Sequence, residues 1–262
     1  MRENSWRPWL PGQSTALPGL AAVIGHRGAA ARAPENTLAG FRKARALGAT
    51  WVEFDVMLSR DEVPMLIHDE TLERTTDGRG RVNQLTAAEL HGLDAGCRFG
   101  PEFAGEPIPT LEEAVALLLE LGLSANLEIK PARGFERRTG EVVADCMGRI
   151  WPADAPRLLF SSFERDALEP VQARLPSVPR GLLATTLPAD WAEALQLLAC
   201  TTLHLDHNWL SPAMLRTLAE ARVPVLLYTV NSAQRARDLL AGGAAAVFSD
   251  VPDVLLAGLS AQ

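Results

Sequence analysis

Short apolar runs alternate with longer mixed runs along most of this chain, and the alternation indicates its architecture. The short runs are rich in Val, Ile, Leu and Phe, which is typical of buried strands. The runs between them carry Ala, Leu, Glu and Arg, which is typical of helices that cover a sheet. We expect strands at 21–26, 51–58, 63–69, 125–130, 157–163, 180–185, 202–207, 223–231 and 245–250, and helices at 38–47, 110–121, 139–150, 190–199, 211–221 and 233–241.

Repeated strand–helix alternation predicts parallel strands, which either a doubly wound sheet or a (β/α)8 barrel provides. A length of 262 residues with more than six strands favours the barrel. Polar residues also follow nearly every strand, whereas a doubly wound sheet concentrates its site at one switch point. We therefore predict a TIM (β/α)8 barrel over residues 21–262, preceded by an N-terminal arm at residues 1–20.

One connection is too short for a parallel crossover. Only the four residues from Ser59 to Glu62 separate the second and third strands, and a parallel crossover needs a dozen or more. We expect a hairpin that sets Asp55 roughly opposite His68 and returns this histidine to the barrel mouth. Residues 70–108 then form an insertion without a strong strand or helix pattern, which we interpret as a cap beside the site.

Composition and charge exclude some classes of function. The net charge of -7 and the pI near 5.3 argue against broad nucleic-acid binding, although a locally positive site can still bind an anion. Cys97, Cys146 and Cys200 lack metal-site spacing and are expected to be free thiols in a reducing compartment. We see no signal peptide and no uncharged apolar span of about 20 residues, so we expect a cytoplasmic protein without membrane insertion.

Three carboxylates are candidates for a metal site. Glu53 and Asp55 are two apart on one strand, so both side chains leave the same face of the sheet. Glu128, at the end of the next barrel strand, supplies a third carboxylate. Oxygen ligands without cysteine are typical of a hard cation, Mg2+ or Ca2+. The alternative is that these groups are solvated or paired with Arg and Lys.

The first strand ends in a polar tip, His26-Arg27-Gly28, and a helix begins about ten residues later. An imidazole titrates near neutrality and a guanidinium suits phosphate, so this tip combines a proton-transfer group with an anion clamp. Gly28 is expected to let the backbone approach the ligand, and Asn36 or Thr37 to cap the following helix.

A second histidine and a lysine extend this chemistry. His68 ends the third strand, so His26 and His68 can converge on one mouth, where one removes a proton and the other donates one. Arg27 and Lys130 place cations where a phosphate would bind. A carboxylate-held metal, these cations and two histidines fit displacement at phosphorus. No phosphate-binding loop of the nucleotide type occurs.

Eight motifs together resemble one enzyme family. They are GHRG, APENT, VEFDVMLSRDEVPMLIHDETLERTTDG, IPTLEEA, NLEIKP, LLFSSF, LLYTVN and FSDVPD. In order and spacing, over about residues 20 to 255, they resemble the glycerophosphodiester phosphodiesterases of the cytosolic bacterial type. The resemblance implies a TIM barrel with a small insertion after the HD strand. It also implies hydrolysis of substrates such as glycerophosphocholine or glycerophosphoethanolamine to glycerol 3-phosphate and an alcohol.

The resemblance also implies roles for particular residues and one divalent cation, Mg2+ or Ca2+. The residues are His26 and His68 as the acid/base pair, Arg27 and Lys130 on the substrate side, Tyr228 against the glycerol or in the core, and Glu53, Asp55 and Glu128 as metal ligands.

Two alternatives stay open. One is a hydrolase with a lipid substrate, of the lysophospholipase D or sphingomyelinase D kind, although the polar insertion favours a deacylated substrate. The other is a barrel that binds a phosphorylated ligand without turning it over, although a mere binder has little use for two histidines. The expected partner is a small molecule rather than nucleic acid, and the Ala- and Leu-rich helices allow a homodimer.

Overall fold

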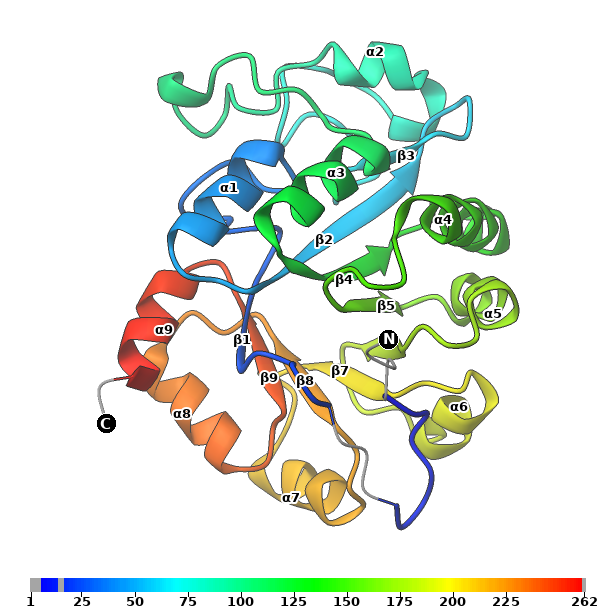
Figure 1. The fold of residues 1–262 in the computed structure, drawn as a ribbon, viewed down its shortest axis with the longest axis vertical. Helices are drawn as coiled ribbons and strands as arrows, with labels where there is room; N and C mark the ends of the chain where they lie inside the picture. Colours follow the sequence, from blue (N-terminus) through cyan, green and yellow to red (C-terminus); the bar gives the residue numbers. More distant parts are fainter. Residues whose placement is uncertain (1–5, 14–16, 261–262) are drawn as a thin grey trace.

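The chain forms a closed barrel of parallel strands with helices on its outside (Figure 1). The structure is a computed structural model, which describes residues 6–13 and 17–260. Part of the expected N-terminal arm therefore lies outside the described residues. The barrel strands are β1 Val23–Gly25, β2 Trp51–Leu58, β4 Ser124–Ile129, β5 Leu158–Ser162, β6 Arg180–Ala184, β7 Thr202–Asp206, β8 Val225–Tyr228 and β9 Ala246–Ser249.

Pairing of the first strand closes the barrel. β1 is parallel to both β9 and β2, while each of the other barrel strands is parallel to its two neighbours. The predicted TIM barrel is confirmed. Its outer helices are α1 Leu38–Ala46, α3 Leu111–Leu121, α4 Glu136–Ile150, α5 Arg165–Arg174, α6 Trp191–Leu197, α7 Pro212–Glu220, α8 Ala233–Ala241 and α9 Pro252–Ser260.

Two of these helices, α5 and α9, are absent from the sequence prediction. α5 carries Pro170 in its interior, which removes one backbone donor and weakens the helical pattern. α9 begins with Pro252, a residue that fits the first helical position because it needs no N–H partner there. Packing on the barrel stabilises both helices, since Leu168 and Leu255 are fully buried.

The short connection after β2 is a hairpin, as predicted. β3 (Pro64–Leu66) is antiparallel to β2, with Val56 opposite Leu66. Continuing this register would set Asp55 opposite Ile67, so the expected pairing of Asp55 with His68 is wrong by one residue. His68 follows the end of β3, and it reaches the barrel mouth from a loop rather than from the sheet.

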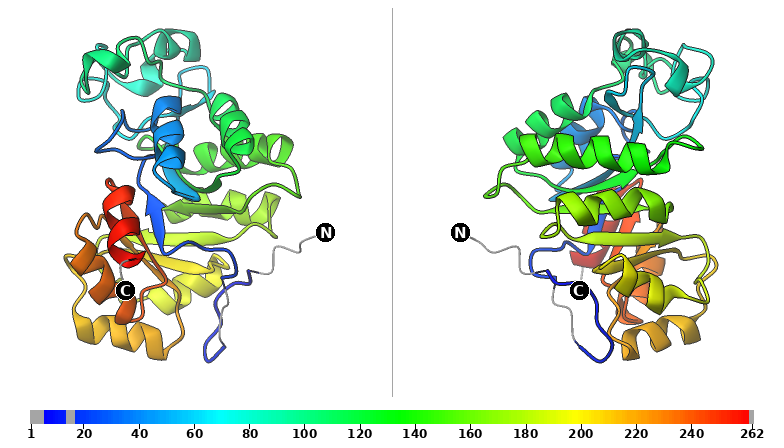
Figure 2. Two further views of the ribbon diagram at one scale, coloured as in Figure 1. Left: turned by 60° about the vertical axis from the view of Figure 1, so that its left-hand side comes forward. Right: turned by 90° about the vertical axis from the view of Figure 1, so that its right-hand side faces the viewer.

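The insertion contains short helical turns that its sequence did not reveal. They are η1 Val82–Gln84, α2 Ala87–His91 and η2 Pro101–Phe103. α2 is stabilised by a capping box, in which Thr86 and Glu89 each bond the other's backbone N–H. In Figure 2 the insertion, coloured cyan to green, lies at one end of the molecule beyond α1 and α3. It has its own small apolar cluster, which includes Leu72 and Leu90.

Alternation along each strand divides its side chains between two environments. On β2, Phe54 packs outward against Phe41 of α1, while Glu53 and Asp55 leave the opposite face and enter the barrel. Apolar side chains from several barrel strands form a further buried cluster. Trp6 of the N-terminal segment belongs to this cluster and stacks on Trp51 with ring centroids 5.8 Å apart. Among the described helices, none has the length and apolar run needed to cross a bilayer.

Candidate active site

A pocket opens at the carboxyl ends of the barrel strands, where TIM-barrel enzymes place their active sites. Its cavity volume is about 190 Å³. It is lined by His26, Arg27, Glu53, His68, Asn126, Glu128, Lys130, Phe163, Leu183, His204, Tyr228, Thr229 and Phe248. Seven of the eight site residues named from the sequence line this pocket, and the eighth, Asp55, belongs to the acidic cluster at its edge.

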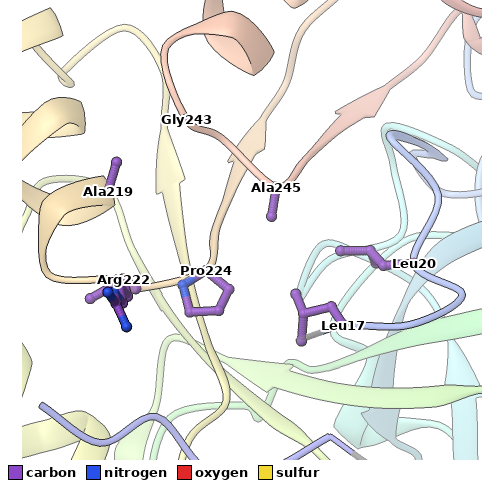
Figure 3. A pocket seen from close by; sticks show the side chains of 8 residues that line it. Leu17, Leu20, Ala219, Arg222, Pro224, Gly243 and Ala245 are labelled. Carbon is purple, nitrogen blue, oxygen red and sulfur yellow. The ribbon is translucent and has the colours of Figure 1, made fainter. Parts of the chain in front are cut away.

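A larger pocket lies at the other end of the barrel and does not fit catalysis. Figure 3 shows it between Leu17 and Leu20 of the N-terminal segment and the residues that precede β8 and β9. Its cavity volume is about 390 Å³, and among the described residues of its lining Arg222 is the one that is ionisable. A single cation among apolar side chains supplies neither an acid/base pair nor a metal site.

Glu53, Asp55 and Glu128 meet at the mouth as the sequence predicted. The strand register sets Asp55 beside Glu128 across β2 and β4. Each of the three carboxylates offers an oxygen within 4.8 Å of the others, and all three residues are buried. Glu53 Oε1 and Glu128 Oε1 have no hydrogen-bond partner among the described residues. Inward-facing orphan oxygens are the donor set that a divalent cation binds.

The protonation behaviour of this cluster reflects like charges held together. Burial, followed by repulsion from Asp55, raises the pKa of Glu53 well above its usual value and that of Glu128 to about 8. Burial is the largest influence on Asp55 and opposes its ionisation, but the charge of Arg27, together with smaller contributions that include the hydrogen bond from Asn36, outweighs burial and lowers the pKa of this carboxyl. A bound dication would remove the repulsion, so the residues present fit a metal site.

The loop before α1 supports this cluster. Asn36 donates from Nδ2 to Asp55 Oδ2 at 2.8 Å, and its Oδ1 accepts from the Asp55 backbone N–H at 3.0 Å. Of the two expected capping residues, Thr37 is the N-cap, since its hydroxyl accepts from the Gly40 N–H. Asn36 is thereby free to orient a site carboxylate.

Gly28 is required by the packing of its loop. Its φ is +89°, and a Cβ at this position would lie 2.8 Å from the backbone carbon of Gly40. The loop therefore requires glycine because it crosses α1 closely. The expected approach of this backbone to a ligand stays a prediction.

A carboxylate orients His26. Nδ1 of its ring lies 2.6 Å from Asp250 Oδ1, and because an ionised carboxylate only accepts, Nδ1 carries the proton. Nε2 faces the acidic cluster, 3.9 Å from Glu53 Oε2. Asn231 holds Asp250 from behind by donating to Oδ2 at 2.7 Å. The ring therefore presents Nε2 to the pocket.

His68 has the same arrangement from a different loop. Its Nδ1 lies 2.5 Å from Asp69 Oδ1, and its Nε2 lies 2.7 Å from Lys130 Nζ. An ammonium only donates, so Nε2 accepts and the proton resides on Nδ1. Burial lowers the pKa of His68 below its usual value, which keeps the ring neutral. A neutral ring with a basic Nε2 suits a proton acceptor.

Arg27 connects the first strand to the insertion. It lies 3.3 Å from Asp55 Oδ2 through Nε and donates to Glu35 Oε1 at 2.8 Å. Glu35 also accepts two hydrogen bonds from Arg74, which in turn bonds Asp69. This chain of ion pairs fixes the position of Arg27 and, through Asp69, that of His68.

Sequence reasoning did not assign these orienting residues. Asp69 and Asp250 were visible only as polar residues after strands, and nothing in the spacing pairs a particular one with a particular histidine. Tyr228, by contrast, lines the pocket, and its contact with the glycerol group stays a prediction. Its hydroxyl donates to the Ala184 carbonyl at 3.0 Å, and its ring meets Phe163 edge-on.

Fold and site together define a class: a (β/α)8-barrel enzyme whose mouth combines a buried acidic cluster, two carboxylate-oriented histidines and two cations. A family model described as "Glycerophosphoryl diester phosphodiesterase family" matches residues 26–254. The chain belongs to the glycerophosphodiester phosphodiesterase family.

Relatives cover nearly the whole chain. A glycerophosphodiester phosphodiesterase of Caldanaerobacter subterraneus is 34% identical over 239 residues, covering 89% of this chain and 96% of the relative. The solved structure of an Oleispira antarctica phosphodiesterase, in complex with the product sn-glycerol-3-phosphate, is 40% identical with a TM-score of 0.89, over 92% of this chain and 98% of that one. That of an Agrobacterium tumefaciens glycerophosphodiester phosphodiesterase is 26% identical with a TM-score of 0.74, over 91% and 100%.

Proposed function

We propose that this protein hydrolyses glycerophosphodiesters to sn-glycerol 3-phosphate and an alcohol. The observation that carries the proposal is the convergence of two imidazole Nε2 atoms and three buried carboxylates on one pocket. Family membership and the product bound to the Oleispira relative support the substrate class.

The acidic cluster is proposed to hold one divalent cation through Glu53, Asp55 and Glu128. Mg2+ and Ca2+ both suit three carboxylate ligands, and the ion would offset negative charge on the phosphate oxygens. Arg27 and Lys130 add donors beside the same position, so the phosphate meets positive charge from more than one direction.

The histidines are proposed to move the protons. His68, with a free-base Nε2, takes the proton from the attacking hydroxyl as its oxygen bonds to phosphorus. In its doubly protonated form, His26, whose ring lies between the carboxylates of Asp250 and Glu53, gives the Nε2 proton to the departing alkoxide as the phosphorus–oxygen bond breaks. A water and a neighbouring glycerol hydroxyl both lose one proton on attack, so the same pair serves either nucleophile.

The direct test measures release of glycerol 3-phosphate from several glycerophosphodiesters, with and without EDTA. We expect release from at least glycerophosphocholine or glycerophosphoethanolamine, and loss of release with the chelator. No release from any glycerophosphodiester, with either Mg2+ or Ca2+ supplied, would contradict the proposed function.

A second assay separates deacylated from lipid substrates. We expect kcat/KM for glycerophosphocholine to exceed that for lysophosphatidylcholine by about tenfold or more. The pocket is small, and charged residues such as Arg74 and Arg81 are exposed on the insertion beside it. An acyl chain would lose little water-exposed surface there. Preference for the lipid would make the lysophospholipase D or sphingomyelinase D alternative the better one.

The remaining expectations are kept as proposals. They are a cytoplasmic location, a small-molecule partner rather than nucleic acid, a possible homodimer, and a single barrel domain at 21–262 with an arm at 1–20 and a cap-like insertion at about 70–108.

A further inference from the structure

The floor of the active-site pocket contains two buried polar groups that the proposed chemistry does not use. Asn126 of β4 and His204 of β7 both line the pocket and are buried, with exposed fractions of 1% and 0%. Asn126 Oδ1 and His204 Nδ1 have no hydrogen-bond partner among the described residues. Leaving such an atom unpaired away from water costs free energy, so both atoms indicate that a ligand supplies the missing hydrogen bonds.

The imidazole of His204 is held in place by contacts with neighbouring residues. Thr202 Oγ1 lies 2.9 Å from Nε2, and the ring packs against Phe248 with centroids 5.4 Å apart. A Cβ on Gly181 would lie 2.5 Å from Nε2, so the neighbouring strand must carry glycine to make room. The protein thus holds the Nε2 edge of the ring, whereas Nδ1 remains available to a ligand in the pocket.

Both residues lie deeper in the barrel than the proposed phosphate site. Asn126 precedes the acidic-cluster residue Glu128 by two positions, and His204 precedes Asp206 at the strand end by two. Two residues of strand span about 7 Å. A substrate whose phosphate meets Arg27 and Lys130 at the mouth would place its far end at this floor.

The chemistry of the floor favours a neutral hydroxyl. Burial lowers the pKa of His204 to about 3, so the ring is neutral, and the amide of Asn126 carries no charge. Asn126 Nδ2 already donates to Ser161 Oγ at 2.9 Å, which leaves its carbonyl oxygen as an acceptor. A phosphate or carboxylate oxygen offers no proton to that acceptor, whereas a hydroxyl can donate to it and also pair with either tautomer of His204.

We propose that Asn126 and His204 bind the terminal hydroxyl of the glycerol group, the one farthest from phosphorus. This inference rests on the proposed function, because it takes glycerol 3-phosphate as the common part of the substrates. Binding of this hydroxyl at the floor would let the enzyme distinguish a glycerol group from an alkyl chain. The alcohol on the other side of the phosphate would stay at the mouth.

Measurements of ligand affinity test the proposal without turnover. Isothermal titration calorimetry gives Kd for sn-glycerol 3-phosphate and for the matching enantiomer of propane-1,2-diol 1-phosphate, which lacks only the terminal hydroxyl. We expect wild type to bind the first about tenfold or more tightly, as the loss of buried hydrogen bonds implies. Equal Kd values in wild type would overturn the proposal, because the floor would then bind water rather than substrate.

A matched pair of variants assigns the effect to one atom. The amide of His204→Gln reaches the place of Nε2 and keeps the contact with Thr202, whereas that of His204→Asn reaches the place of Nδ1. We expect Gln to abolish the preference between the two ligands and Asn to retain it, with Tm measured for both. Retention of the full preference in His204→Gln contradicts the assignment.

The failure of this inference differs from a failure of the proposed function. Wild type that hydrolyses glycerophosphocholine but binds both ligands equally keeps the function and loses the inference. Wild type that releases no glycerol 3-phosphate loses the function, whatever the calorimetry shows.

Discussion

Replacement of His26 or His68 by alanine is expected to lower kcat for glycerophosphocholine by about 10²-fold or more, the usual contribution of a general acid or base. Each ring presents Nε2 to the pocket while a carboxylate holds Nδ1, so removing the ring removes both the proton carrier and its orientation. KM is expected to change less than kcat, since Arg27 and Lys130, which we propose bind the phosphate, are unchanged. Steady-state rates of glycerol 3-phosphate release give both constants.

His91→Ala is a matched control for these substitutions. This histidine lies on α2 of the insertion, where Nδ1 contacts the Ile108 carbonyl, and it does not line the pocket. Its loss should leave kcat near the wild-type value, with Tm reporting the fold of every variant. Near-normal kcat in both His26→Ala and His68→Ala would refute the acid/base assignment and return the non-catalytic binder to consideration.

Local periodicity predicted the parts of this site that lie on regular strands. Alternation with a period of two places Glu53 and Asp55 on one face, and it requires no knowledge of tertiary contacts. Closure of a parallel barrel then brings the ends of all its strands to one rim. Glu128 joins the cluster for that reason, although it is separated from Asp55 by more than 70 residues.

Contacts made from loops were beyond the sequence pattern. His68 lies in the loop after β3, where strand periodicity no longer fixes the position of a side chain. The register expected for it in the hairpin therefore differs by one residue from the observed one. Asn36 supports Asp55 rather than capping a helix, and the sequence pattern does not separate these roles because the same side-chain type does both. Arg74 bonds Glu35 across 39 positions of sequence, a pairing that depends on how the insertion folds back.

The role of His204 at the floor of the pocket also depends on tertiary contacts that the sequence pattern does not show. His204 alternates with Leu203 and Leu205 on a buried strand, and a lone histidine there is more often a satisfied core residue. Two observations distinguish His204 from such a residue: Nδ1 has no partner in the part of the chain that the structure describes, and Gly181 leaves room for the ring. Such a distinction needs the neighbouring strands in place.

Removal of divalent cations is expected to lower the rate of hydrolysis by about 10²- to 10⁴-fold, because a dication contributes several kcal/mol of charge stabilisation on phosphate oxygens. Protein treated with EDTA and then dialysed should regain activity with Mg2+ or Ca2+. Glu53→Gln should shift the activation curve to higher metal concentration, since one of three charged ligands becomes neutral while the side chain keeps its shape.

A second measurement separates metal binding from turnover. Burial and mutual repulsion raise the pKa values of Glu53 and Glu128, so a cation that relieves this repulsion binds the folded state and should raise Tm as its concentration increases. Glu112→Gln, which changes an exposed carboxylate on α3, should keep the full increase, whereas Glu53→Gln should show a smaller one. Chelator-treated protein that keeps full activity would show that the carboxylates act without an ion. The guanidinium of Arg27 and the ammonium of Lys130 would then have to offset the negative charge of the phosphate without help from a metal ion.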